Sequence, residues 1–303
     1  MRNDPTSKLA KSLKTCDLAR SLGKGNASAQ INARLAALET INAAVTAPYT
    51  LDIELFDGAN FTLIATEDVC KSIFVSGAFE PEIGACIERY CGPGDHCLDI
   101  GAHVGYFTRV LASVVGEAGK VCAFEPVPDT FSLLTRNAQD LPQVHLIEAA
   151  CTDRAGTTSI KYFGRTWSAF STVGTSRLPD GAPETYEELS IKTVTVDEMV
   201  ALHDLHPKFV KLDAENSEVA VLKGMARTIA NHRPAIVIEV GDSEGHDQSL
   251  DALFMLMDHG YDIYDLHMSG IRPHAPLETG TYSYDNLLAV HTQDKRVDRL
   301  NRL

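Results

Sequence analysis

The chain has few basic residues, no long apolar run and no close pairing of cysteines. It contains 27 Lys and Arg against 41 Asp and Glu, which gives a formal net charge of −14. This acidic balance disfavours nucleic acid or an anionic membrane surface as a partner. No apolar stretch approaches the ~18 residues of a transmembrane helix, and no signal peptide is recognisable. We therefore expect a cytoplasmic protein that binds neither nucleic acid nor membranes.

The cysteines lack the spacing of a zinc site or a disulfide framework. There are seven of them, an odd number, and no CxxC pair occurs. Several, such as Cys97 and Cys122, lie in apolar runs that are typical of strands. The pattern favours buried, reduced thiols.

An apolar run ends in a turn, and a helical pattern begins, in the segment Cys97-Leu-Asp-Ile-Gly-Ala-His-Val-Gly-Tyr-Phe-Thr108. This turn has one glycine fewer than the turn of a dinucleotide-binding fold. Dinucleotide folds use Gly-x-Gly-x-x-Gly, so that the pyrophosphate reaches the helix N-terminus. Here His103 stands at the middle position, between Gly101 and Gly105. The pattern disfavours a nicotinamide-dependent oxidoreductase. It favours S-adenosylmethionine (SAM), which has no phosphate to bind.

A carboxylate follows this turn at the distance expected for a ribose ligand. Glu125 ends the run Val121-Cys-Ala-Phe and precedes Pro126, about 20 residues after the turn. A carboxylate at the end of a second strand can accept hydrogen bonds from both ribose hydroxyls. Asp99 is a second candidate for binding, directly or through the amides of the turn. Helix capping or a salt bridge is the structural alternative for Glu125.

Strand-like runs and helical patterns alternate along the rest of the chain, which is typical of a parallel sheet with helices on both faces. We expect strands at 97–100, 121–125, 144–150, 209–213, 235–240 and 286–291. We expect helices near 104–115, 128–139, 216–230 and 248–258. The predicted fold class is therefore α/β, with a mostly parallel Rossmann-like sheet.

Two segments depart from the alternation. Residues 157–196 hold strand-like pieces around a loop rich in Gly, Ser, Thr and Pro, which predicts a hairpin-like insertion over the carboxyl edge of the sheet. Residues 1–48 form an N-terminal extension, and the domain proper then spans 49–303. That domain opens with a hairpin over 50–66, with its turn at Asp57-Gly58.

A helix is predicted over residues 28–45 of the extension, with Ser28 as its cap and Pro48 beyond its end. Ile31, Leu35, Leu38 and Val45 form a seam along it. The seam fits packing on the protein's own domain, or a contact between two copies in a homo-oligomer.

Further carboxylates end later strands. Asp213 ends Phe209-Val-Lys-Leu-Asp, Glu215 follows it, and Glu239 lies in Ile236-Val-Ile-Glu-Val. Carboxyl ends of parallel strands meet at one edge, where ligands bind. The three acids are candidates for catalysis, with Asp213 as first choice of general base. They are also candidate oxygen ligands for Mg²⁺ or another hard cation.

A set of motifs in a fixed order resembles the FkbM-type class I SAM-dependent methyltransferases over roughly residues 75–291. The matching segments are Asp99 to Gly105, Phe124 to Pro126, Leu133 to Asn137, Ala149 to Gly156, Thr193 to Asp197, Lys211 to Glu218, Val221 to Gly224 and Pro234 to Glu239. The resemblance implies a class I methyltransferase sheet with an antiparallel last strand. It implies that SAM is the methyl donor and that a hydroxyl of a sugar or natural-product small molecule is the acceptor.

The resemblance also assigns roles to residues. It places Asp213, Glu215 and Glu239 toward the acceptor and Asp153 near the adenine. Our candidate cofactor-binding residues are Asp99, Gly101, His103, Gly105, Glu125, Pro126 and Asp153. His103 and Asn216 replace residues that are usual in the family. These departures keep open an amine or carboxylate acceptor, and a SAM-binding scaffold without catalysis.

Overall fold

The structure is a computed structural model that describes residues 33, 34, 36–38, 40, 48–174, 178, 183–241, 248–277, 282 and 285–301. The chain divides into two compact units, Met1–Phe79 and Glu80–Leu303. The described residues between 33 and 40 are helical, while the rest of the helix predicted over 28–45 lies outside the described residues. No helix within the described ranges has the length and apolar character needed to cross a membrane.

The N-terminal unit contains the hairpin that Asp57-Gly58 predicts. Strands β1 (Thr50–Glu54) and β2 (Asn60–Ile64) pair antiparallel. The Asp57 carboxylate accepts a hydrogen bond from the Ala59 amide at 3.1 Å, and Gly58 adopts a φ of +79°. Helix α3 (Asp68–Ser76) contacts β2, and its first amides donate to the Glu67 carboxylate.

The C-terminal unit is built on an eight-stranded sheet. Its strands are β3 (His96–Ile100), β4 (Lys120–Phe124), β5 (Val144–Ile147), β9 (Pro207–Leu212), β10 (Ala235–Val240), β11 (Tyr261–His267), β12 (Gly270–Pro273) and β13 (Asp285–His291). Their order is β12-β11-β13-β10-β9-β3-β4-β5, and the five strands from β10 to β5 are parallel. The last strand, β13, runs antiparallel to both neighbours. The predicted α/β class with an antiparallel last strand is confirmed, and β11 and β12 are additional to the predicted strands.

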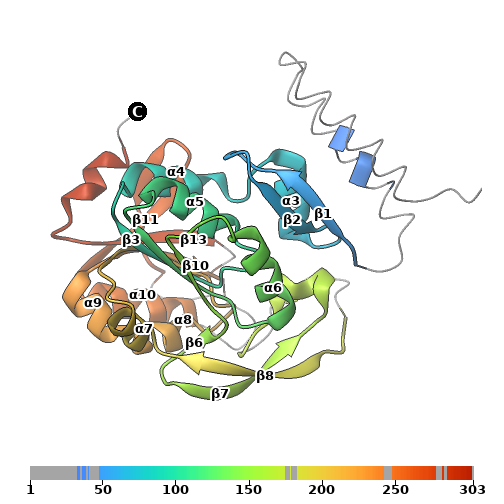
Figure 1. The fold of residues 1–303 in the computed structure, drawn as a ribbon. Coiled ribbons are helices and arrows are strands. Elements are labelled where there is room, and N and C mark those ends of the chain that lie inside the picture. Colours follow the sequence, from blue (N-terminus) through green and yellow to red (C-terminus); the bar gives the residue numbers. More distant parts are fainter. Residues whose placement is uncertain are drawn as a thin grey trace, which may run out of the picture. The chain divides into compact units, whose positions relative to one another are not determined.

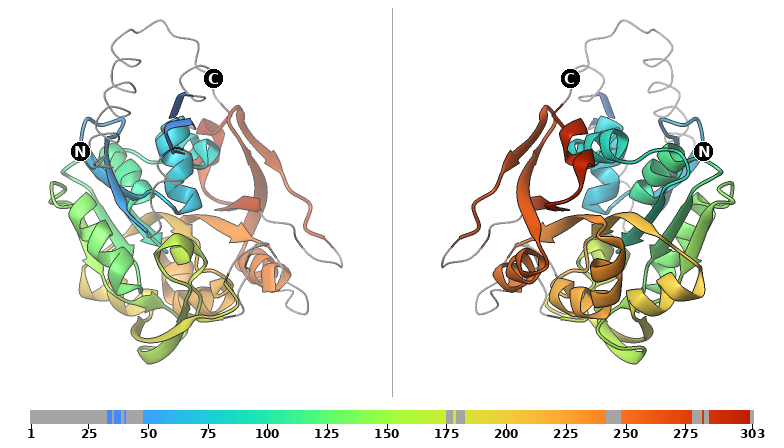
Figure 2. Two further views of the ribbon diagram at one scale, coloured as in Figure 1. Left: turned by 90° about the vertical axis from the view of Figure 1, so that its right-hand side faces the viewer. Right: turned by 90° about the vertical axis from the view of Figure 1, so that its left-hand side faces the viewer.

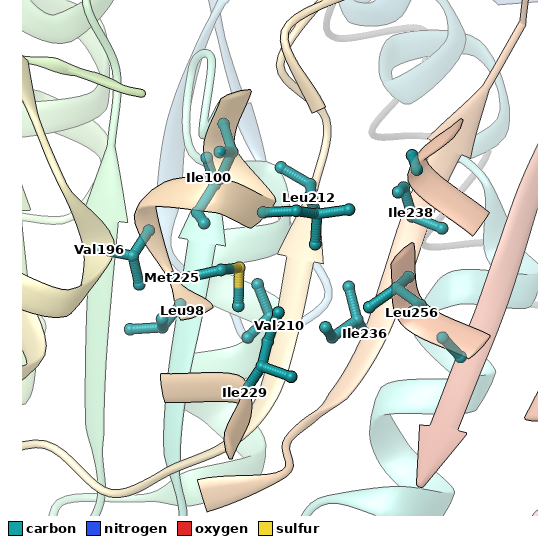
Figure 3. Packing of buried hydrophobic residues seen from close by; sticks show 14 of the residues in the cluster. Leu98, Ile100, Val196, Val210, Leu212, Met225, Ile229, Ile236, Ile238 and Leu256 are labelled. Atoms are coloured by element: carbon teal, nitrogen blue, oxygen red, sulfur yellow. The ribbon is translucent and has the colours of Figure 1, made fainter. Parts of the chain in front are cut away.

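Helices cover both faces of this sheet (Figures 1 and 2). They are α4 (Pro81–Tyr90), α5 (Tyr106–Val115), α6 (Pro128–Asn137), α7 (Val196–Leu202), α8 (Glu218–Gly224), α9 (Ala226–His232) and α10 (Gln248–Asp258). A large apolar core lies between the strands and α7 to α10. In Figure 3, Leu98, Val210 and Ile236 point from three neighbouring strands toward Met225, Ile229 and Leu256.

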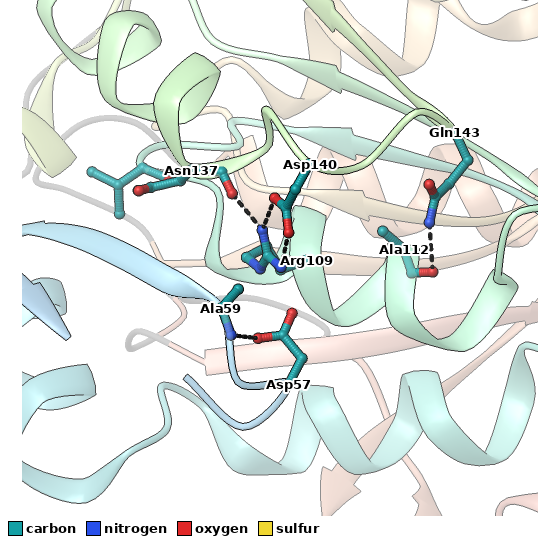
Figure 4. Close-up of polar contacts among 8 residues, drawn as sticks. Asp57, Ala59, Arg109, Ala112, Asn137, Asp140 and Gln143 are labelled. Atoms are coloured by element: carbon teal, nitrogen blue, oxygen red, sulfur yellow. Dashed lines mark hydrogen bonds and ion pairs between the residues drawn. The ribbon is translucent and has the colours of Figure 1, made fainter. Parts of the chain in front are cut away.

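The opposite face packs against α5 and α6. Ala123 of β4 contacts Leu134 of α6, whereas its neighbours Cys122 and Phe124 belong to the larger core. A polar contact joins the two helices: Arg109 donates to both Asp140 carboxylate oxygens, at 2.7 and 3.0 Å, and to the Asn137 carbonyl at 2.6 Å (Figure 4).

Two local expectations need correction. The strand predicted over 144–150 ends at Ile147, and β6 (Ala150–Cys151) instead joins β7 (Gly156–Tyr162) and β8 (Glu187–Val194) in a separate three-stranded sheet with the order β6-β8-β7. The helix predicted over 216–230 is two helices, because Met225 leaves helical geometry with a φ of −119°. The six cysteines among the described residues are buried and free of disulfides, as the sequence predicts.

Candidate functional site

The candidate site lies at the carboxyl edge of β4, β3, β9 and β10, which are adjacent in the sheet. The chain passes from β3 to β4 on one side and returns to β9 on the other. Strand order therefore reverses at β3. In open α/β sheets such a reversal is where ligands bind, because the loops on either side diverge and leave a crevice.

The turn after β3 needs its glycines for steric reasons. Gly101 has a φ of +80°, and a Cβ placed there would lie 1.8 Å from the carbonyl oxygen of Asp213. Gly105 has a φ of +92°, and a Cβ there would lie 2.7 Å from Leu134 Cδ1. The loops that follow β3 and β9 are thus in backbone contact. This contact brings Asp213 next to the glycine turn.

His103 takes the missing glycine's place in a left-handed conformation with a φ of +51°. Its backbone amide donates to Glu125 Oε2 at 3.1 Å. Its ring Nε2 lies 3.0 Å from the hydroxyl of Ser168, in the 3₁₀ helix η1 (Arg165–Phe170) of the insertion. The insertion therefore reaches the carboxyl edge, as predicted, and His103 connects it to the glycine turn.

Glu125 is held rigidly at the end of β4. It is 6% exposed, and its second oxygen accepts the Val127 amide at 2.9 Å, across Pro126. Burial raises the pKa of Glu125 to about 7, although both amide donors oppose the shift. Each carboxylate oxygen can accept more than one hydrogen bond, so these amides orient the group and leave lone pairs for a ligand.

Asp99 is completely buried beneath the turn. One oxygen accepts the Thr108 hydroxyl at 2.6 Å, and the other, Oδ1, has no hydrogen-bond partner within the described part of the chain. Burial raises the pKa of Asp99, and the nearby Lys211 ammonium opposes that shift. A buried acceptor of this kind carries a free-energy penalty unless something satisfies it, and such groups gather at functional sites.

The three acids proposed for the acceptor side come together. Oxygens of Asp213, Glu215 and Glu239 all lie within 4.8 Å of one another. Glu215 and Asn216 both have positive φ, +47° and +68°, which bends the loop after β9 sharply. The Thr172 hydroxyl of the insertion donates to the Glu215 carbonyl. The geometry suits hydrogen bonding to a hydroxyl-rich ligand or coordination of a hard cation.

The structure adds Lys211, which sequence reasoning missed. Lys211 is 3% exposed, and its ammonium lies 2.7 Å from Asp213 Oδ2. Burial alone would lower its pKa, but the charges of Asp213, Asp99 and Glu80 shift that pKa above the ordinary value. The available signal was a single lysine inside the apolar strand Phe-Val-Lys-Leu. Ser168 and Thr172 were missed too, because no local pattern marks them.

Asp153, His267 and His274 fall among the described residues. Asp153 follows β6 and is paired at 3.6 Å with Arg154, where its side chain is 42% exposed. His267 ends β11. His274 lies 2.6 Å from Asp265 and 2.9 Å from the Tyr282 hydroxyl. His246 lies outside the described residues.

The residues present fit SAM. Five carboxylates, those of Asp99, Glu125, Asp213, Glu215 and Glu239, gather near one buried lysine, so the edge favours a cationic ligand over a pyrophosphate. The turn has no room for a Cβ at Gly101, because the Asp213 backbone lies against it, and this contact sets the turn beside the loop after β9. Asp99, Gly101, His103, Gly105 and Glu125 lie together at the turn after β3.

The sequence matches the Methyltransferase FkbM domain family over residues 99–263, and the chain belongs to this family. The predicted family and the predicted methyltransferase class of enzyme are confirmed. The hexuronic acid methyltransferase AglP of Haloferax volcanii is 27% identical over 59% of this chain and 69% of its own length. The methyltransferase sdnD of Sordaria araneosa is 27% identical over 56% of this chain and 79% of its own.

Solved structures are similar at a lower level. A methyltransferase FkbM from Methylobacillus flagellatus has a TM-score of 0.42 and 16% identity, covering 73% of this chain. The match spans about half of that protein, 52% of its chain. Fibrillarin of Aeropyrum pernix, solved with natively bound S-adenosyl-L-methionine, has a TM-score of 0.42 and 12% identity over 80% of this chain and 93% of its own.

Proposed function

We propose that the protein is a SAM-dependent O-methyltransferase whose acceptor is a hydroxyl of a sugar or natural-product small molecule in the cytoplasm. The observation that carries the proposal is the meeting of Glu125 with the Gly101 turn and of Asp213 with Glu215 and Glu239 at one sheet edge. The family and the AglP relative, named as acting on a hexuronic acid, support a sugar acceptor. The acidic composition of the chain, with a net charge of −14, disfavours nucleic acid as the acceptor.

SAM, when bound, supplies a methyl group already activated by a positively charged sulfur. The chain then has two tasks: to align the acceptor oxygen with that methyl group and to remove the hydroxyl proton. Alignment alone can lower a barrier by roughly 7–11 kcal/mol. In our proposal Glu125 and the glycine turn fix the donor, while Glu215 and Glu239 orient the acceptor and Asp213 accepts its proton.

The same acids suit a second arrangement, in which Asp213, Glu215 and Glu239 hold Mg²⁺ or another hard cation. A bound cation would orient the acceptor and lower the pKa of its hydroxyl. The oxygens lie within 4.8 Å of one another, as such a site requires. Chelation of an active preparation separates the two arrangements, because only the metal-dependent reaction would stop in EDTA.

Incubation with isotope-labelled SAM and uronic-acid-containing oligosaccharides, then with a native small-molecule extract, tests the proposal. We expect mass spectrometry to show a product heavier by one CH₂ group that survives mild alkali. A product cleaved by alkali would be a methyl ester and would point to a carboxylate acceptor, and label on nitrogen would point to an amine. SAM binding in calorimetry with no transfer to any acceptor would favour a scaffold. Binding of NAD in place of SAM would overturn the assignment.

A further inference from the structure

Lys211 places a fixed positive charge inside the acidic edge of the sheet. It is the only buried lysine among the described residues. It lies on β9 directly opposite Asp99 of β3 in the strand register, and its Nζ is 2.7 Å from Asp213 Oδ2. The ring of Phe107 lies beneath the ammonium at 5.2 Å. Both neighbouring strands and α5 therefore fix its position.

This position bears on how the three acids can be used. A magnesium ion bonds carboxylate oxygens at about 2.0–2.1 Å. An ion on Asp213 Oδ2 would then stand within about 5 Å of the Lys211 ammonium, in a buried region where like charges repel strongly. One of the two Asp213 oxygens, Oδ2, is already engaged by a cation that belongs to the protein.

We propose that Lys211 is the resident cation of this site and a positioning residue for methyl transfer. Its ammonium occupies the charge position that a divalent ion would take, and it holds the Asp213 carboxylate against β3 and the glycine turn. Its effect on catalysis rests on the function proposed above, with Asp213 as the base. Its effect on metal binding does not depend on that function.

A second hydrogen bond, from a residue of β13, orients Glu80 near the cluster. Asn286 of β13 is opposite Glu239 in the register and donates to Glu80 at 2.8 Å. Glu80 is one of the charges that act on Lys211. Lys211 is thus surrounded by acids from β3, β9 and the start of α4, and its removal would leave those acids without their buried countercharge.

The test compares Mn²⁺ binding by electron paramagnetic resonance in the full chain without SAM. We expect no Mn²⁺ site at the cluster in the wild type. In Lys211→Met, which keeps the length of the lysine stem and removes the ammonium, we expect Mn²⁺ to bind at least about tenfold more tightly than in the wild type, because the repelling charge is gone. Glu215→Gln in that background should remove the gained site. Lys211→Arg should behave as the wild type, and so should Lys208→Met, an exposed lysine on the same strand.

An activity arm completes the test. Turnover of the wild type should survive EDTA, whereas Lys211→Met should lose at least about tenfold in kcat with SAM affinity unchanged, since Asp213 is no longer positioned. Mn²⁺ binding in Lys211→Met equal to that of the wild type would overturn the proposal. If Lys211→Met does not fold, a wild-type Mn²⁺ site that Glu215→Gln abolishes would overturn it equally. Absence of SAM binding or methyl transfer would count against the proposed function alone, because the Mn²⁺ comparison needs neither.

Discussion

Glu125 is the residue on which the cofactor assignment depends most directly. Its two oxygens accept hydrogen bonds from the backbone amides of His103 and Val127. A glutamine at this position would point its own NH₂ donor at one of these amide donors. We expect Glu125→Gln to weaken SAM binding at least about tenfold, or about 1.4 kcal/mol, in calorimetry. Glu88→Gln, at an exposed acid of α4, is the matched control. Unchanged affinity in a folded Glu125→Gln protein would contradict the assignment.

Burial of Glu125 also predicts a pH dependence of stability. Its pKa rises from an ordinary 4.5 to about 7 in the folded protein, so the native state keeps a proton that the unfolded chain releases between these values. The contribution of Glu125 to the free energy of unfolding therefore falls as pH rises from about 4.5 to 7. Urea unfolding of the ligand-free protein should show Glu125→Gln gaining stability relative to wild type between pH 5 and pH 8. A pH-independent difference would show that Glu125 is already ionised at pH 5.

Alanine substitutions at Gly101 and Gly94 can distinguish a steric clash from backbone strain. Gly101 and Gly94 have nearly equal φ, +80° and +84°, but a Cβ meets the Asp213 carbonyl at 1.8 Å in the first and nothing within 4 Å in the second. Gly94→Ala should cost about 1–2 kcal/mol from backbone strain alone. Gly101→Ala should cost clearly more and should also weaken SAM binding, because the loops after β3 and β9 must separate. Equal thermal unfolding of the two variants would refute the close approach.

At the scale of elements, Arg109 joins α5 to the end of α6 through an asymmetric ion pair. The Arg109 side chain is 3% exposed and that of Asp140 is 54% exposed. Removing Asp140 takes an anionic partner from a buried guanidinium, whereas removing Arg109 leaves an acid that water can solvate. We expect Asp140→Ala to destabilise the protein more than Arg109→Met, by on the order of 1 kcal/mol in urea unfolding. The reverse order would mean that packing of the Arg109 stem dominates.

Elements whose periodicity matches their burial could be predicted from the sequence, and those that tertiary contacts decide could not. β3, β4, β9 and β10 are short apolar runs bounded by turns, and all four lie where the sequence places them. The break at Met225 directly follows Gly224, but a single glycine is tolerated inside a helical pattern and does not by itself mark an end. β11 did carry a signal, because buried Tyr261 and Ile263 alternate with exposed Asp262, and that signal was overlooked.

The candidate site follows the same division. Glycine spacing and the strand-end acids identify Glu125, Asp213 and Glu239, because their places along the chain are enough to bring them to one edge. Lys211 needs the strand register, since only the pairing of β9 with β3 sets it opposite Asp99. Register depends on contacts between distant segments, which a single sequence does not display.

For the whole molecule, the family match covers residues 99–263, all within the C-terminal unit. The N-terminal unit lies outside that match. Within it, Leu38 is 4% exposed and Arg34 donates to the carbonyls of Phe74 and Val75, so part of the predicted helix over 28–45 packs on its own unit. Its seam of Ile31, Leu35, Leu38 and Val45 has the spacing with which helices pair between chains.

We expect the full chain to be a homodimer in light scattering at tens of micromolar. Leu35→Glu places a charge in the seam and should yield a monomer that still binds SAM, because the proposed cofactor residues all lie beyond residue 98. Gln30→Glu, off the seam, should remain dimeric. A wild-type chain that is monomeric at this concentration would confine the helix to packing within its own unit.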